Sequence, residues 1–180
     1  MNKRALIIGL IYSVVVIAFK LFILLGDYTL TKFGFYYSNI VAIFLIIPFF
    51  MLAIYLVREK DFGGIISGKD AIRMALTVLA VAAVILTVYN YIEFNWKFKE
   101  IATQYYNSSE YLTVLRDMQS KMPDKIKTED FPKIIQEQIA ALSAGKATTG
   151  KLFPLVLIGL SGAFICSVFM KRSVSRKQLN

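Results

Sequence analysis

The stretch that decides the fold is residues 71–99, AIRMALTVLAVAAVILTVYNYIEFNWKFK. Apart from Arg73 near its start, it is almost entirely apolar as far as Val88, and it contains neither Gly nor Pro. A helix rises about 1.5 Å per residue, so about 20 apolar residues cross the hydrocarbon core of a bilayer. The stretch therefore predicts a transmembrane helix that continues as helix beyond the membrane surface.

Similar apolar runs occur elsewhere in the chain. Hydrophobic residues make up 57% of the sequence, above the share of about 45–50% in soluble domains. A basic amino terminus precedes the first run, as in a signal peptide, but the apolar part is too long for one. We expect an all-α polytopic membrane protein that forms a single membrane domain. Its predicted spans cover residues 5–25, 39–57, 71–92 and 152–170.

Residues 93–150 form a polar insert between the third and fourth predicted spans. Apolar residues recur there at spacings of three and four, which predicts two amphipathic helices. They can pack together as a hairpin on the spans, lie on the lipid surface, or receive a partner, and we favour the hairpin. The residues of the candidate partner surface are Leu112, Leu115, Met118, Phe131, Ile135 and Ile139.

Lys and Arg residues are unevenly distributed among the connecting segments. They gather at the amino terminus, in residues 58–73 and in the carboxyl-terminal tail, whereas basic and acidic residues nearly balance in the insert. Short loops rich in Lys and Arg stay in the cytoplasm. We therefore expect both termini in the cytoplasm of a bacterium and the insert outside its cytoplasmic (inner) membrane.

Four polar residues form a candidate polar cluster: Lys20, Asn90, Glu93 and Asn95. Lys20 lies within the first span, and an ionisable residue there is a functional candidate by default. Its side chain either extends to the membrane interface, pairs with Asp27 or Glu93, or takes part in transport. The other three end the third span among aromatic residues, which is also typical of an ordinary interfacial belt.

Several chemistries lack their usual residues. The chain has no histidine and one cysteine, Cys166, so no His-based nucleophile, disulfide or common metal set can form within it. We expect no catalytic residues, no metal, no cofactor and no enzyme activity. The segments 63–69 and 145–151 match the glycines and lysine of a phosphate-binding loop but lack the Ser or Thr that follows, so we expect no nucleotide. The basic residues flank apolar runs, so we expect no nucleic acid either.

Gly159 and Gly162 in the last span permit the close approach of another helix. That helix belongs either to the same bundle or to a second copy, and packing inside the bundle is our expectation.

The segments 64–71, GIISGKDA, and 89–95, YNYIEFN, resemble those of small bacterial four-span membrane proteins grouped as domain of unknown function 4199. The polar helical insert and the final span ending at Lys171 also fit, so the resemblance extends from about Leu6 to Met170. It implies the same four-span architecture. The family brings no activity, substrate or site residue, so the resemblance implies none.

Our functional hypothesis from the sequence is a non-enzymatic membrane subunit or scaffold that binds a membrane-protein partner or itself, in addition to the lipid bilayer. The alternative is a small carrier or lipid-handling membrane protein, with Lys20 and the cluster around Asn90 and Glu93 on its path.

Overall fold

The computed structural model describes residues 2–26, 28–31, 33–123 and 125–171, and these form helices joined by short turns, with no strand among them. The α-helices are α1 (Lys3–Leu25), α2 (Ser38–Phe44), α3 (Ile46–Asp61), α4 (Gly68–Glu93), α5 (Lys99–Tyr106), α6 (Ser109–Lys121), α7 (Phe131–Ala140) and α8 (Ala144–Met170). The short segments are η1 (Tyr28–Leu30), η2 (Phe33–Tyr37), η3 (Phe94–Phe98) and η4 (Thr128–Asp130).

Four helical segments are long and apolar enough to cross a membrane: Lys3–Leu25, Ser38–Asp61, Gly68–Tyr106 and Ala144–Met170. This confirms the prediction of an all-α protein with four spanning helices. Helices α4 and α8 begin earlier than the third and fourth predicted spans because polar residues cap them. Ser67 accepts a hydrogen bond from the backbone N–H of Asp70 (3.1 Å), and Ser143 accepts one from that of Lys146 (3.3 Å).

The second spanning segment is broken. Helix α2 ends at Phe44 and α3 begins at Ile46, with a turn at Leu45 between them. Pro48 follows the break, and proline both lacks a backbone donor and crowds the carbonyl four residues earlier, which belongs to Phe44. The break therefore lies where the proline disrupts the helix.

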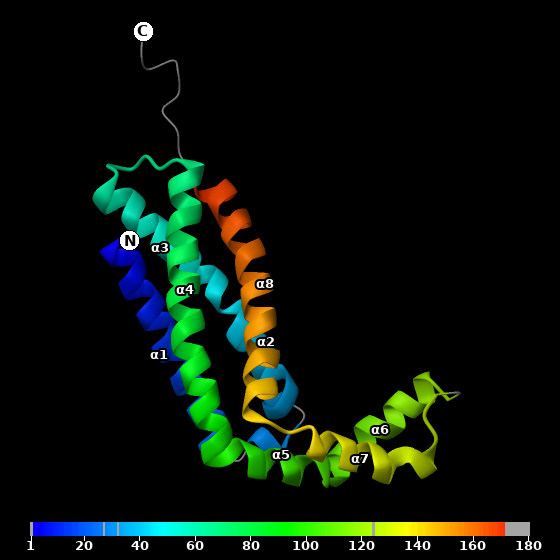
Figure 1. The fold of residues 1–180 in the computed structure, drawn as a ribbon. Helices are drawn as coiled ribbons and strands as arrows, with labels where there is room; N and C mark the ends of the chain where they lie inside the picture. The colour runs from blue at the N-terminus through cyan, green and yellow to red at the C-terminus, as the bar shows by residue number, and fades with distance from the viewer. Residues whose placement is uncertain (1, 27, 32, 124, 172–180) are drawn as a thin grey trace.

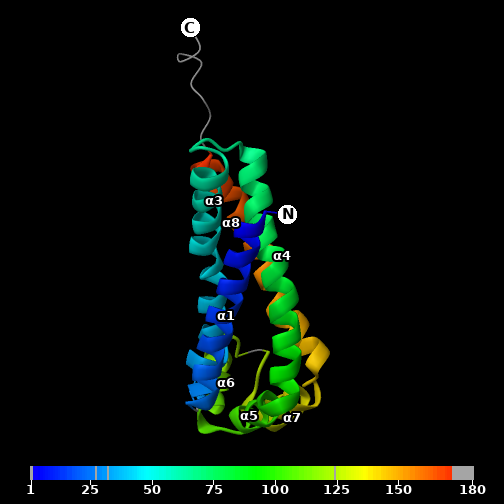
Figure 2. The same ribbon diagram turned by 90° about the vertical axis from the view of Figure 1, so that its left-hand side faces the viewer.

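Helix α4 lies at the centre of the bundle. It runs beside α8, and α1 packs along its other side (Figures 1 and 2). Glycines permit both contacts, because a Cβ atom on Gly9 would lie 2.9 Å from Cβ of Val81, and one on Gly159 would lie 2.5 Å from Cδ1 of Leu79. Gly159 therefore packs inside the bundle, as the sequence led us to expect.

The insert leaves the bundle sideways. Helix α4 continues through η3 into α5, and Figure 1 shows the chain turning there so that α5, α6 and α7 lie across one end of the bundle, which we call the insert end. These helices have a small core of their own, formed by Tyr105, Tyr111, Leu115 and Phe131. The long helical exit predicted for residues 71–99 is present, but its path bends instead of extending straight out of the bundle.

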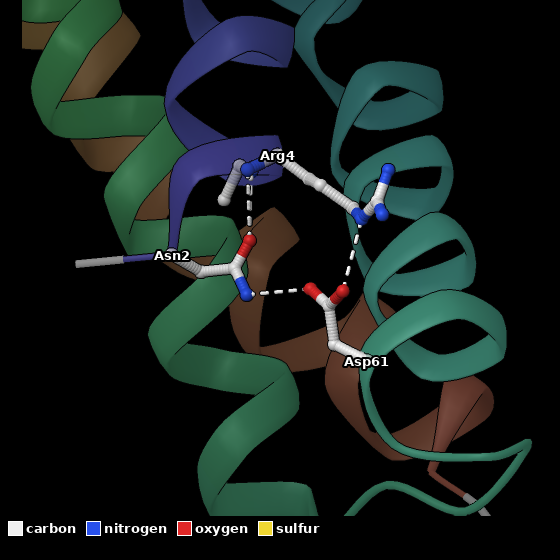
Figure 3. Close-up of polar contacts among 4 residues, drawn as sticks. Asn2, Arg4 and Asp61 are labelled. Carbon is white, nitrogen blue, oxygen red and sulfur yellow. Dashed lines mark hydrogen bonds and ion pairs between the residues drawn. The ribbon is translucent and has the colours of Figure 1, made fainter.

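At the opposite end of the bundle, polar contacts join the start of α1 to the end of α3 (Figure 3). Asn2 caps α1 and donates from Nδ2 to Asp61 Oδ2 (2.8 Å), while Arg4 Nε donates to Asp61 Oδ1 (2.9 Å). The Arg4 and Asp61 side chains are 48% and 29% exposed, so this ion pair is partly hydrated and contributes little to stability.

Gly34 in η2 provides a test of the link between α1 and α2. A Cβ atom there would overlap the backbone carbonyl of Tyr28, and backbone cannot rotate away as a side-chain tip can. We expect Gly34→Ala to destabilise the protein by about 1–3 kcal/mol, as overpacking does. Thermal unfolding of the purified protein in detergent, followed by circular dichroism, measures the change.

Gly150→Ala is the matched control, because Gly150 lies within α8 and nothing approaches its Cβ position within 4 Å. Alanine there should leave stability unchanged or raise it by up to about 1 kcal/mol. Equal melting temperatures for the two variants would contradict the tight contact at Gly34.

Candidate functional site

Polar side chains from four helices meet inside the bundle near its insert end. Lys20 comes from the last part of α1, Asn39 from α2, Asn90 and Glu93 from the last turns of α4, and Lys151 from α8. We call these five residues the polar centre. Each helix supplies apolar residues to the bundle core farther from the insert end, so the polar side chains gather in one layer.

The polar centre contains a buried ion pair. Lys151 Nζ donates to Glu93 Oε2 at 2.7 Å, and the two side chains are only 15% and 5% exposed. Tyr89 donates its hydroxyl to Glu93 Oε1 (2.9 Å), and the Lys151 ammonium lies 4.2 Å from the centre of the Phe98 ring. Both carboxylate oxygens and the ammonium therefore have partners, which a buried pair needs to offset the loss of water.

Lys20 adds a second ammonium to this layer. The residue is 9% exposed, and its Nζ donates to Asn39 Oδ1 at 2.7 Å. The structure thus turns Lys20 toward an amide inside the bundle. Asp27, the other partner considered from the sequence, lies outside the described residues. Among the described ion pairs of the polar centre, the carboxylate of Glu93 is bound by Lys151 and not by Lys20.

Two small cavities flank these lysines, each of about 20 Å³. Glu93 and Phe98 help to line the one nearer the insert, which we call the insert-side cavity. The other, which we call the inner cavity, lies deeper in the bundle. Its described lining residues are Tyr12, Val16, Lys20, Asn39, Ala42, Ile43, Leu86, Asn90, Lys151 and Leu155. Lys20, Asn39 and Lys151 therefore stand between the two spaces and face both.

Asn90 lines the inner cavity and has an unpaired polar atom. The residue is 5% exposed, and its Oδ1 has no hydrogen-bond partner in the described part of the chain. A buried polar atom without a partner costs about 1–3 kcal/mol. Such an atom beside a polar cavity indicates a place where a bound molecule would add the missing contact.

Asn95 does not belong to the polar centre. Its Nδ2 donates to the carbonyl of Tyr91 (2.8 Å), and its side chain lines a different hollow, on the surface of η3 and α5 beside Trp96. Three of the four residues in the predicted polar cluster are therefore brought together: Lys20, Asn90 and Glu93.

The sequence did not single out Asn39 and Lys151 as site residues. Asn39 stands at the start of an apolar run and Lys151 at the edge of another, where a polar residue is commonplace. The one sequence feature that could have indicated them is that each is a polar residue at the boundary of a predicted span. Only the packing of α2 and α8 against α1 and α4 sets them apart from other boundary residues.

The profile of the family described as "Protein of unknown function (DUF4199)" matches residues 3–172. The chain belongs to this family. No curated protein and no solved structure matches it. The match confirms the resemblance stated from the sequence and, with the four apolar helices, identifies this DUF4199 chain as a membrane protein.

The candidate partner surface is largely used within the insert of this DUF4199 chain. Leu115 and Phe131 are buried in its core, and Leu112 and Ile135 pack against that core. Ile139 is half-buried, and Met118 is exposed on α6. A partner surface made of these residues stays a prediction.

The two phosphate-loop matches do not form loops of that kind. Residues 145–151 lie within α8, and Gly68 and Lys69 already belong to α4. Among the described residues, no His, Cys, Asp and Glu side chains group closely enough to hold a metal ion.

Removing one partner of the buried ion pair tests how much the pair contributes to the stability of the fold. Lys151→Met removes the ion-pair partner of the buried Glu93 carboxylate, so we expect the protein to lose about 3–5 kcal/mol of stability. Thermal unfolding in detergent measures the loss. The double variant Lys151→Met with Glu93→Gln should recover most of it, because neither member of the ion pair is then left without the other.

Arg4→Met is the matched control, since it breaks the partly hydrated pair with Asp61 at the other end of the bundle. Its effect should be much smaller. If Lys151→Met and Arg4→Met lower the melting temperature alike, the buried pair is not the stabilising contact described above.

Proposed function

We propose that this protein is a small carrier or lipid-handling membrane protein whose ligand binds at the polar centre. The observation that carries the proposal is the burial of Lys20, Glu93 and Lys151 in one layer, beside two cavities. Ionisable residues within spanning segments are costly and mark ligand or ion pathways by default. A purely structural role would be served more simply by apolar residues of similar size.

The distribution of basic residues supports an orientation. Residues 3, 4, 58, 60, 69 and 73 are Lys or Arg, and all belong to the end of the bundle opposite the insert. By the positive-inside rule, this end faces the cytoplasm of a bacterial cell. The protein is then an inner-membrane protein with both termini cytoplasmic. The insert lies outside, and the polar centre lies near the outer surface.

Cysteine accessibility tests the orientation. The natural Cys166 is buried and is replaced by Ala, and single cysteines are then introduced at the exposed positions Ser109 in α6 and Lys60 in α3. In intact spheroplasts, a membrane-impermeant maleimide should label Ser109→Cys and not Lys60→Cys. Lysis should make both reactive. The reverse pattern in intact spheroplasts would overturn the orientation.

A scaffold that binds a membrane partner or itself is the second candidate function. It is supported by the insert, which has a core separate from that of the bundle and leaves Met118 and Met122 exposed. We place it second because four of the six residues of the candidate partner surface already pack inside the insert. Neither candidate involves catalysis, and we propose that the protein is not an enzyme.

Lys20→Leu distinguishes the two candidates. Leucine removes a buried charge and fills similar space, so we expect the variant to fold as well as the natural protein. In proteoliposomes, the natural protein should release trapped acetate or move fluorescently labelled phosphatidylserine between leaflets faster than protein-free vesicles do. Lys20→Leu should abolish that gain.

Lys99→Leu is the control, because Lys99 is an exposed lysine on α5 outside the polar centre. It should move both probes as the natural protein does. Natural protein that moves neither probe faster than empty vesicles would contradict the carrier proposal. Crosslinking in native membranes that finds only monomers would contradict the scaffold.

A further inference from the structure

We infer that the inner cavity binds one carboxylate group of a ligand, held by Lys20, Lys151 and Asn90. The inference rests on the proposed function, because it names the chemical class of the ligand that the polar centre takes. It follows from the charge, the unpaired atom and the size of this cavity.

The charge around the inner cavity is one-sided. Lys20 enters from α1 and Lys151 from α8, and no described carboxylate lines the cavity. The hydroxyl of Tyr12 donates to the carbonyl of Ala42 (2.8 Å). Glu93 lines only the insert-side cavity and neutralises one lysine, so the polar centre carries one positive charge in excess when both lysines are protonated. Away from bulk water this charge attracts an anion strongly.

The amide of Asn90 contributes the third contact. Its Oδ1 lacks a partner, and an amide can exchange its oxygen and nitrogen by a half-turn of the side chain. The half-turn puts Nδ2, a donor, where the unpaired oxygen stood. Two lysine side chains and one amide N–H then line the same space, which suits the two acceptor oxygens of a carboxylate.

The size of the cavity limits the group that enters. A water molecule needs about 10–15 Å³ of such space, and the inner cavity has about 20 Å³. A flat carboxylate with a single charge matches both the space and the excess charge. A phosphate monoester is bulkier and carries about −1.5 to −2 at neutral pH, so it matches neither. The rest of the ligand must lie outside the cavity, so it is either a small acid or the headgroup of a fatty acid.

Equilibrium binding of two radiolabelled carboxylates tests the inference on the full chain in an uncharged detergent. Acetate represents a small acid and palmitate a fatty acid. At least one should bind at one molecule per chain and be displaced by formate. Chloride and inorganic phosphate at equal concentration should displace it at least tenfold less effectively.

Two variants and a control locate the site. Asn90→Leu and Lys20→Met should each weaken binding at least tenfold, whereas Lys99→Met should leave it unchanged. Asn90→Leu replaces an unpaired amide by an apolar group of similar size, so its melting temperature should not fall. It therefore keeps the test valid even where Lys20→Met alters folding.

Other outcomes overturn the inference: neither carboxylate binds, chloride or phosphate competes as well as formate, or binding survives both substitutions. Its failure differs from failure of the proposed function. Carboxylate binding without movement of either probe across vesicles would leave the inference standing and remove the carrier. Movement of labelled phosphatidylserine that needs Lys20 but is unaffected by any carboxylate would support the carrier and overturn carboxylate binding.

Discussion

The ion pair between Glu93 and Lys151 is the buried contact that constrains the helices at the insert end of the bundle. It joins α4 to α8 at the level where α4 stops being a spanning helix and bends through η3 into the insert. Either charge alone would be expensive away from water, so the two helices must keep the register that brings the carboxylate and the ammonium to 2.7 Å. Tyr89 and Phe98 favour the same helix register, because Tyr89 donates a hydrogen bond to Glu93 and the Phe98 ring lies against the Lys151 ammonium.

The bundle changes character along its axis. Toward the amino-terminal end, close packing is achieved with glycine and alanine, as at Gly9 and Gly159, where helices approach too closely for a side chain. At the polar centre, long polar side chains replace this packing and leave two small cavities. A buried lysine must direct its ammonium group toward hydrogen-bond acceptors, so it cannot fill the space around it as an aliphatic side chain does. The same residues therefore create both the polarity of the site and the space in it.

Much of this architecture could be predicted from periodicity and hydropathy. The four spans follow from the length of the apolar runs, and the break near Pro48 follows from the geometry of proline. The insert was harder to predict. Its apolar stripes were visible, yet α5 joins α6 and α7 in forming the insert's core, with Tyr105 and Tyr111 central to it. The spacing of apolar residues includes Tyr105 but not Tyr111, and a tyrosine is also common at a membrane interface, so residue type alone did not reveal this packing.

Four helical membrane spans and membership of the DUF4199 family follow from the amino-acid sequence, because burial in lipid imposes length and composition on each helix separately. The sequence also singled out Lys20, Asn90 and Glu93, since polar residues are conspicuous within or beside apolar runs. The packing of the helices brings Asn39 and Lys151 to the same layer, keeps Asn95 out of it, and turns Lys20 inward to an amide. Those outcomes depend on the rotation and register of helices far apart in the chain. Packing sets these quantities, and no local pattern encodes them.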